Sequence, residues 1–193
     1  MNKKLIYMLS LFALLAVATG VAVAAFGDKG EVLGSSFSVG SADIKLLEDL
    51  AGGTSSENLS DQLNGPSFAN ISPSWSKDYP LKTYNNATTH IQLTSNASYL
   101  TENDTEDLRQ IIFVEPFNWG DANNDGLVDE SELGSSFGRK TIIKWKTEGY
   151  DLSSVAPGSV KGMILRFSTD TVSDTKQGAN AIFDFEFDSL GIE

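Results

Sequence analysis

Hydrophobic and polar residues alternate along several short stretches of the chain. In residues 181–188, apolar side chains fall at 181, 183, 185 and 187, and acidic side chains fall at 184, 186 and 188. The same alternation occurs at 162–168, and at 141–146 it sets Ile143 and Trp145 on one side. A period of two places one set of side chains in a core and the other in solvent. We therefore expect a β-strand at each of these three stretches.

Shorter apolar runs suggest further strands. We expect them at 37–47, 79–84, 90–94 and 111–120. Glycine and proline mark turns between the runs, at 52–53, 65–66, 157–158 and 178. The helix signal is limited to single turns at 105–109 and 130–133. Many short strands without alternating helices predict an all-β fold, specifically a jelly-roll-like antiparallel β-sandwich.

Residues 121–132 match the twelve-residue EF-hand calcium loop. Gly126 stands at position 6, where the sharp turn favours a residue without Cβ. The predicted ligands supply side-chain oxygens, or a backbone carbonyl in the case of leucine, and they are Asp121, Asn123, Asp125, Leu127, Asp129 and Glu132. Calcium is a hard cation that takes about six to eight oxygen ligands. We predict Ca²⁺ as the cofactor, held by an EF-hand-type loop inserted into the sandwich.

The segments that flank this loop do not look like the paired helices of an EF-hand sensor. Pro116 lies in the strand-like stretch before the loop, and Gly134 stops a helix soon after it. A calcium switch needs both helices to open a groove. Structural calcium, bound with an affinity on the order of 10⁻⁴ M, is the expectation. The alternative is an acidic, glycine-containing turn without an ion.

Residues 1–24 have the features of a secretory signal peptide. Lys3 and Lys4 precede an apolar run over 5–23, and small residues stand at the cleavage positions in 22–24. An uncleaved membrane anchor is the alternative, because the run is nearly long enough to span a bilayer. We expect a secreted chain that begins at residue 25 and has no membrane association after cleavage.

Charge and composition limit the classes of molecule that the chain is expected to bind. Removal of the signal takes the formal net charge from −12 to −14, which disfavours nucleic acid and anionic membranes. The chain has no cysteine, so its core, its metal or its neighbours must hold it together. Predicted N-glycosylation sequons stand at Asn58, Asn70, Asn86, Asn96 and Asn103. The alternative is a β-protein that is simply rich in Ser, Thr and Asn.

Three segments carry a family resemblance. Residues 24–28 read Ala-Ala-Phe-Gly-Asp, residues 36–46 read Ser-Phe-Ser-Val-Gly-Ser-Ala-Asp-Ile-Lys-Leu, and residues 177–187 read Gln-Gly-Ala-Asn-Ala-Ile-Phe-Asp-Phe-Glu-Phe. In this order they resemble the TasA/camelysin family of secreted biofilm-matrix fibre proteins, which includes the archaeal bundling pilins. Residues 71–75 lack the glycine of that family's Pro-Gly turn.

The resemblance implies that residues 41–193 form a jelly-roll subunit of a biofilm-matrix fibre or pilus. Residues 25–40 would be a donor strand that completes the sheet of the next copy, through main-chain hydrogen bonds and side-chain pockets. The predicted anchors are Phe26, Val32, Leu33, Phe37 and Val39. Such a head-to-tail homopolymer need not close, so it grows as a filament. Other matrix fibres or surface glycans are further candidate partners. The alternative is pairing within the same subunit, or disorder.

Residues for catalysis are scarce. The chain has one histidine, His90, and no His-Glu-x-x-His, whereas a catalytic zinc draws its ligands mainly from His, Cys and carboxylates. We expect no enzyme, and we rank a camelysin-like protease third. The second candidate is a monomeric calcium-binding adhesion or sugar-binding module, for which Trp75, Trp119 and Trp145 are a candidate stacking platform, although sheet aromatics are more often buried.

Overall fold

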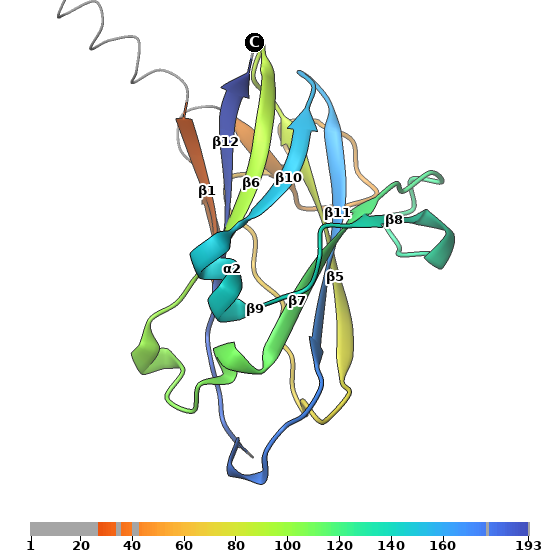
Figure 1. The fold of residues 1–193 in the computed structure, drawn as a ribbon. Helices are drawn as coiled ribbons and strands as arrows, with labels where there is room; N and C mark the ends of the chain where they lie inside the picture. Colours follow the sequence, from red (N-terminus) through yellow and green to blue (C-terminus); the bar gives the residue numbers. More distant parts are fainter. Residues whose placement is uncertain (1–26, 34–35, 40–42, 177, 193) are drawn as a thin grey trace, which may run out of the picture.

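The computed structural model describes residues 27–33, 36–39, 43–176 and 178–192, with only the backbone considered before residue 43 (Figure 1). The predicted signal peptide and Phe26 lie outside the described residues. Within them, the protein has an all-β fold of two antiparallel sheets around one core, as predicted. No helix among the described residues is long and apolar enough to cross a membrane.

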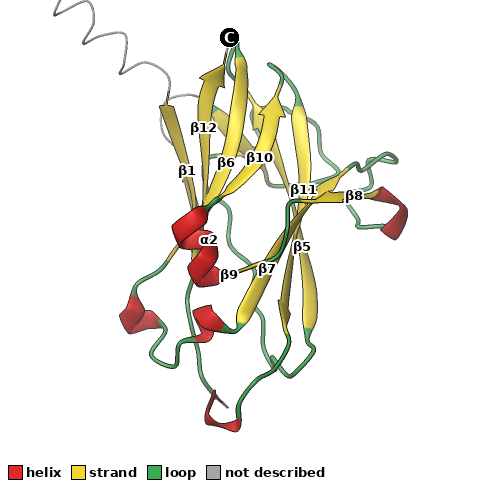
Figure 2. Cartoon of the chain, viewed as in Figure 1, coloured by secondary structure: helices red, strands yellow, loops and turns green. Residues whose placement is uncertain are grey.

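The elements follow one another along the chain with few helical turns between strands (Figure 2). The strands are β1 (Gly27–Leu33), β2 (Ser36–Val39), β3 (Ile44–Leu47), β4 (Leu59–Ser60), β5 (Ser76–Asn85), β6 (His90–Ser98), β7 (Ile112–Trp119), β8 (Leu133–Ser136), β9 (Lys140–Thr141), β10 (Tyr150–Val155), β11 (Val160–Thr169) and β12 (Asp184–Ile192). The helical elements are η1 (Thr101–Asn103), η2 (Leu108–Gln110), η3 (Glu130–Glu132), α2 (Ile142–Glu148) and η4 (Asp174–Lys176).

Each sheet combines strands that are far apart in the sequence. The five-stranded sheet has the order β10-β6-β12-β1-β2, and the seven-stranded sheet has the order β4-β3-β5-β11-β7-β8 with β9 also paired to β7. The chain changes sheet from β5 to β6, from β6 to β7, and again from β10 through β11 to β12. The predicted opening strand at 37–47 is therefore two strands, β2 in one sheet and β3 in the other.

The core follows the predicted alternation. Inward positions of β11 and β12 are buried, namely Met163, Leu165, Phe167, Phe185 and Phe187. β12 begins at Asp184, later than predicted, and continues to the end of the described chain. Ala181 and Phe183 precede the strand but still pack against the core. The stretch at 111–120 is also a strand, β7, as expected.

The predicted strand at 141–146 is wrong, because this segment is helix α2. Thr141 caps the helix by accepting a hydrogen bond from the Lys144 amide at 3.3 Å. Gly149 ends it with a φ of +64°. Trp145 is fully buried, whereas Ile143 is 36% exposed, so the buried positions follow helical spacing. Six residues of alternation fit a strand or a helix, and the caps decide between them.

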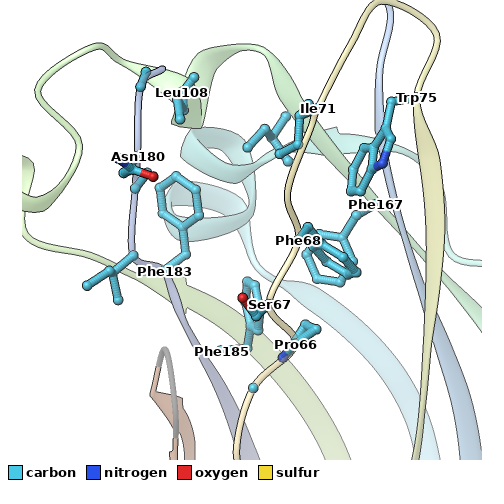
Figure 3. Close-up of a pocket in the computed structure, with 15 residues that line it drawn as sticks. Pro66, Ser67, Phe68, Ile71, Trp75, Leu108, Phe167, Asn180, Phe183 and Phe185 are labelled. Atoms are coloured by element: carbon cyan, nitrogen blue, oxygen red, sulfur yellow. The ribbon is translucent and has the colours of Figure 1, made fainter. Parts of the chain in front are cut away.

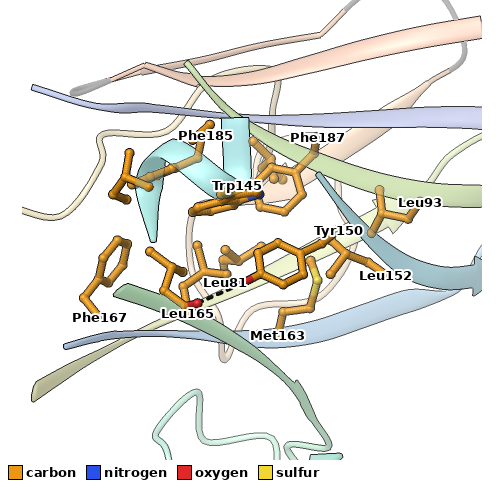
Figure 4. Packing of buried hydrophobic residues seen from close by; sticks show 14 of the residues in the cluster. Leu81, Leu93, Trp145, Tyr150, Leu152, Met163, Leu165, Phe167, Phe185 and Phe187 are labelled. Atoms are coloured by element: carbon orange, nitrogen blue, oxygen red, sulfur yellow. Dashed lines mark hydrogen bonds between the residues drawn. The ribbon is translucent and has the colours of Figure 1, made fainter. Parts of the chain in front are cut away.

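Helix α2 contacts both β6 and β7 and brings Trp145 into the space between the sheets (Figure 4). The indole stacks on Phe185 with ring centroids 4.7 Å apart and donates from Nε1 to the Ser95 carbonyl at 3.1 Å. The neighbouring Tyr150 donates its hydroxyl to the Val114 carbonyl at 2.8 Å, and burial raises its pKa. These two polar contacts tie α2 and β10 to strands of both sheets.

We expect Trp145→Ala to lower the free energy of unfolding by about 3–5 kcal/mol, because it leaves a core cavity and removes the bond to Ser95. The matched control is Ile143→Ala on the exposed side of the same helix, which should change stability by about 0.5 kcal/mol or less. Urea denaturation measures both. Equal losses in the two variants would contradict the assigned orientation of α2.

Candidate calcium loop and its surroundings

The loop at 121–132 connects β7 to β8 and projects from the seven-stranded sheet (Figure 1). Its base is closed by the pairing of Trp119 with Leu133 and by a hydrogen bond from the Gly120 amide to the Glu132 carbonyl at 3.1 Å. A strand ladder therefore fixes both ends of the loop, where an EF-hand has two helices. The only helical turn within the loop is η3, at its end.

The side-chain oxygens at the first three predicted ligand positions turn into the loop. Asp121 accepts from the amides of Asp125 at 3.2 Å and Gly126 at 3.0 Å. Asn123 Oδ1 accepts from the Asp125 amide at 3.1 Å, and Asp125 Oδ1 accepts from the Leu127 amide at 2.8 Å. Gly126 has a φ of +72°, as the sharp turn at position 6 requires. The hard oxygen donors and the turn geometry fit a calcium ion.

The side chains at the last two predicted ligand positions, Asp129 and Glu132, do not converge with the first three. Glu132 reaches back to the start of the loop, where it accepts from the Ala122 amide at 3.0 Å and from Trp119 Nε1 at 3.3 Å. Asp129 precedes η3 and its side chain makes no capping hydrogen bond. In the described part of the chain, no three His, Cys, Asp or Glu side chains are close enough together to hold a metal. The loop offers ligands of the right type, with its acidic side chains still separated.

A buried lysine from β5 supports the loop from below. Lys82 is 7% exposed, and its Nζ lies 2.6 Å from Asp121 Oδ2 and 2.6 Å from the Leu50 carbonyl. The ammonium also lies 5.1 Å from the Trp119 ring centroid. The hydrogen bond from Lys82 lowers the pKa of the Asp121 carboxyl, and the hydrogen bonds from the Gly126 and Asp125 amides lower it further. The stabilising effect of these bonds is present above the unfolded carboxyl pKa and is lost as the pH falls through the folded pKa.

A few buried apolar residues lie on the outer face of the seven-stranded sheet, next to the base of the loop. Ile164 is fully buried although it alternates with core residues of β11, so its side chain needs a cover on the outer face. Leu47 and Trp119 are also buried without belonging to the main core. Trp119 packs on Gly162, where a Cβ would lie 2.5 Å from the Trp119 carbonyl oxygen. We call Leu47, Trp119 and Ile164 the outer cluster, and the neighbouring Lys82 bonds to both the loop and the turn at 48–53.

Gly126 lies at the contact between the loop and that turn. A Cβ at Gly126 would lie 2.8 Å from the Ala51 amide nitrogen. We expect Gly126→Ala to lower the free energy of unfolding by about 1–3 kcal/mol, through backbone strain and this contact. Gly120→Ala is the control, because a Cβ there meets no atom within 4 Å. Thermal denaturation compares the two variants. If Gly126→Ala lowered the melting temperature no more than Gly120→Ala, the contact with the turn at 48–53 would not hold the loop in place.

The predicted polymerisation residues lie on the first two strands, except for Phe26. Val32 and Leu33 are in β1, and Phe37 and Val39 are in β2. β1 pairs with β12 from Gly27 opposite Leu190 to Val32 opposite Phe185, and β2 pairs with the outer side of β1. In the single chain, the N-terminal segment thus completes its own five-stranded sheet.

The five sequons differ in how they are placed. Asn58 Nδ2 donates to the carbonyls of both Asp49 and Gly53, at 2.9 and 2.8 Å, so both of its amide hydrogens are used. Asn96 is half-buried on β6. Three sequon asparagines are exposed, namely Asn70, Asn86 and Asn103, and Asn86 donates to Asp43. Asn58 is therefore a structural residue of its loop in the folded chain, while Asn70 and Asn103 are the most accessible acceptors.

A cavity of about 340 Å³ opens near the start of β12 (Figure 3). Its aromatic wall includes Phe68 and Trp75, whose ring centroids lie 5.0 Å apart in a T-shaped arrangement. Trp75 lines this cavity, but Trp119 and Trp145 are 4% and 0% exposed. The three tryptophans therefore do not form a common stacking platform, and burial, the more common explanation for sheet aromatics, accounts for Trp119 and Trp145. The single histidine, His90, is exposed at the start of β6.

Comparisons with known proteins add little to this description. No protein-family model matches the chain, and no curated protein matches it. Among solved structures, the chain aligns with an ASH/PapD-like domain of human CEP192 (PapD-like domain 7) at 14% identity, over 65% of this chain and 79% of that one. The TM-score is 0.26, and so weak a likeness carries no argument about this protein.

Proposed function

We propose that the protein is the structural subunit of an extracellular filament, a jelly-roll sandwich that polymerises by donor-strand complementation and is stabilised by calcium. The observation that carries the proposal is the position of β1 between β12 and β2 in the five-stranded sheet. This strand directly follows the predicted signal peptide and pairs with β12 in a continuous antiparallel register. The family resemblance supports the same assignment.

The sheet order explains how a second copy could take the place of β1. β12 lies between β6 and β1, so withdrawal of the β1–β2 hairpin leaves β12 with an open edge. An open edge presents unpaired amides and carbonyls, which a strand from another chain can satisfy. The segment from a second copy brings the same residues and the same register. Exchange therefore replaces contacts already made within the chain, and repeated exchange in one direction builds a filament.

A disulfide test distinguishes the two pairings, because the chain has no cysteine of its own. Glu31 on β1 lies directly opposite Glu186 on β12, and facing residues have Cβ atoms about 4.5–5.5 Å apart, close to disulfide range. We expect the double variant Glu31→Cys with Glu186→Cys to give a ladder of linked chains on non-reducing gels of assembled material. A mixture of the two single variants should give the mixed dimer.

The control pairs Glu31→Cys with Ser154→Cys on β10, at the far side of the same sheet. This pair should not give the ladder. A double variant that forms only an internal disulfide, with no linked chains in assembled samples, would refute strand exchange and favour the monomeric adhesion or sugar-binding module. The aromatic cavity lined by Phe68 and Trp75 supports that second candidate.

The calcium part of the proposal assigns the ion to the loop between β7 and β8. Asp121, Asn123 and Asp125 would hold it through side-chain oxygens, Leu127 through its carbonyl, and Asp129 and Glu132 would complete the shell. A bound divalent cation supplies positive charge that offsets repulsion among the acidic residues. We expect bound calcium to stabilise the folded loop and its contacts with Lys82 and Trp119.

We expect calcium to raise the melting temperature of the wild-type protein, and expect Asp121→Ala with Glu132→Ala to abolish this rise. Because Asp121 also bonds to Lys82, the milder variant Glu132→Gln tests the ligand shell with less damage to the loop. Glu102→Gln, an exposed change far from the loop in sequence, is the control and should respond to calcium as the wild type does. The same melting temperature in calcium and in EGTA for the wild type would refute the site.

A further inference from the structure

We propose that Lys82 is a built-in cation that keeps the loop folded without calcium and weakens calcium binding. The inference rests on the proposed calcium site and concerns the regulation of its affinity. Lys82 comes from the middle of β5, 39 residues before Asp121, so no feature of the loop sequence announces it. Its ammonium reaches the first ligand position of the loop from within the fold.

The position of the ammonium is fixed by its surroundings. Lys82 lies between the inward-facing Leu81 and Thr83, which are 1% and 2% exposed, so its own side chain lies on the outer face of β5. Gly162 lies directly opposite on β11, so no side chain of that residue competes for the space. The ammonium then donates to the Leu50 carbonyl and to Asp121 Oδ2, both at 2.6 Å. A buried charge needs such partners, and here they belong to the turn at 48–53 and to the loop.

The same contact has two opposite consequences. Without calcium, one positive charge offsets part of the negative charge of the loop and binds it to the turn at 48–53. With calcium, the ion has to share Asp121 with the ammonium, whose Nζ already occupies one carboxylate oxygen. Two like charges at one buried carboxylate repel each other more strongly than they would in water. Lys82 should therefore raise the stability of the calcium-free protein and lower its affinity for calcium.

The test replaces the ammonium by a neutral side chain of similar length. We expect Lys82→Met, in the protein otherwise unchanged, to bind calcium about tenfold more tightly by isothermal titration with calcium chloride, a difference of about 1.4 kcal/mol. Its melting temperature in EGTA should fall, so the rise on adding calcium becomes larger. If Lys82 were needed only for packing, its substitution would lower both the calcium affinity and the melting temperature. Lys82→Arg retains the charge and should keep the affinity within about twofold of the wild type.

The control is Lys45→Met, which removes the same unit charge from β3, where Lys45 pairs with Asp43 and Asp61 outside the loop. Its affinity should remain that of the wild type. If Lys82→Met does not fold, Lys82→Gln retains hydrogen-bond donors without the charge and makes the same comparison. Unchanged or weaker binding in the neutral variants would overturn the role of Lys82. Absence of binding in both the wild type and the neutral variants would instead overturn the calcium site itself, and this inference with it.

Discussion

Burial on both faces at the centre of β11 is the constraint on which much of this structure depends. Met163 and Leu165 face the five-stranded sheet, whereas Ile164 between them faces the opposite side, and all three are fully buried. A sheet buried on both faces needs two covers. The five-stranded sheet covers one face. On the other face, Lys82 and Trp119 lie on either side of Gly162 and bond to the turn at 48–53 and to the loop at 121–132. The proposed calcium site thus adjoins the outer face of this strand.

The loop at 121–132 is also connected to the sheet by side-chain contacts. Trp119 makes the first connection, because its ring packs on Gly162 while its indole nitrogen donates to Glu132. A change in the position of Glu132 would therefore directly alter a hydrogen bond of the buried Trp119. Lys82 adds a second connection, from β5 to Asp121. These two contacts connect the loop to β5 and β7 of the sheet, and the proposed calcium site lies within that connected unit.

The five-stranded sheet poses a separate problem, which concerns its edge. Its strand β12 carries Phe185 and Phe187 into the core and depends on β1 for one of its two neighbours. The described core is built from residues between Ile44 and Phe187. The proposed exchange changes only which copy supplies β1, while the packing of Trp145 against Phe185 stays within one chain. A filament assembled in this way would keep the main core of each subunit intact.

Local patterns in the sequence were enough to predict the strands at 111–120 and 162–168. Alternation with a period of two is a property of neighbouring residues, so it can be read without the fold. The same alternation failed at 141–146, where the cap at Thr141 and the glycine at 149 favour a helix.

Other features were decided only by the tertiary structure. The contact of Lys82 with Asp121, the burial of Ile164 on the outer face and the use of both Asn58 amide hydrogens depend on segments that meet only after the sheets form. The fold class was therefore open to prediction from local periodicity. The environment of the candidate site was not, because it arises from contacts between residues that are distant in the chain.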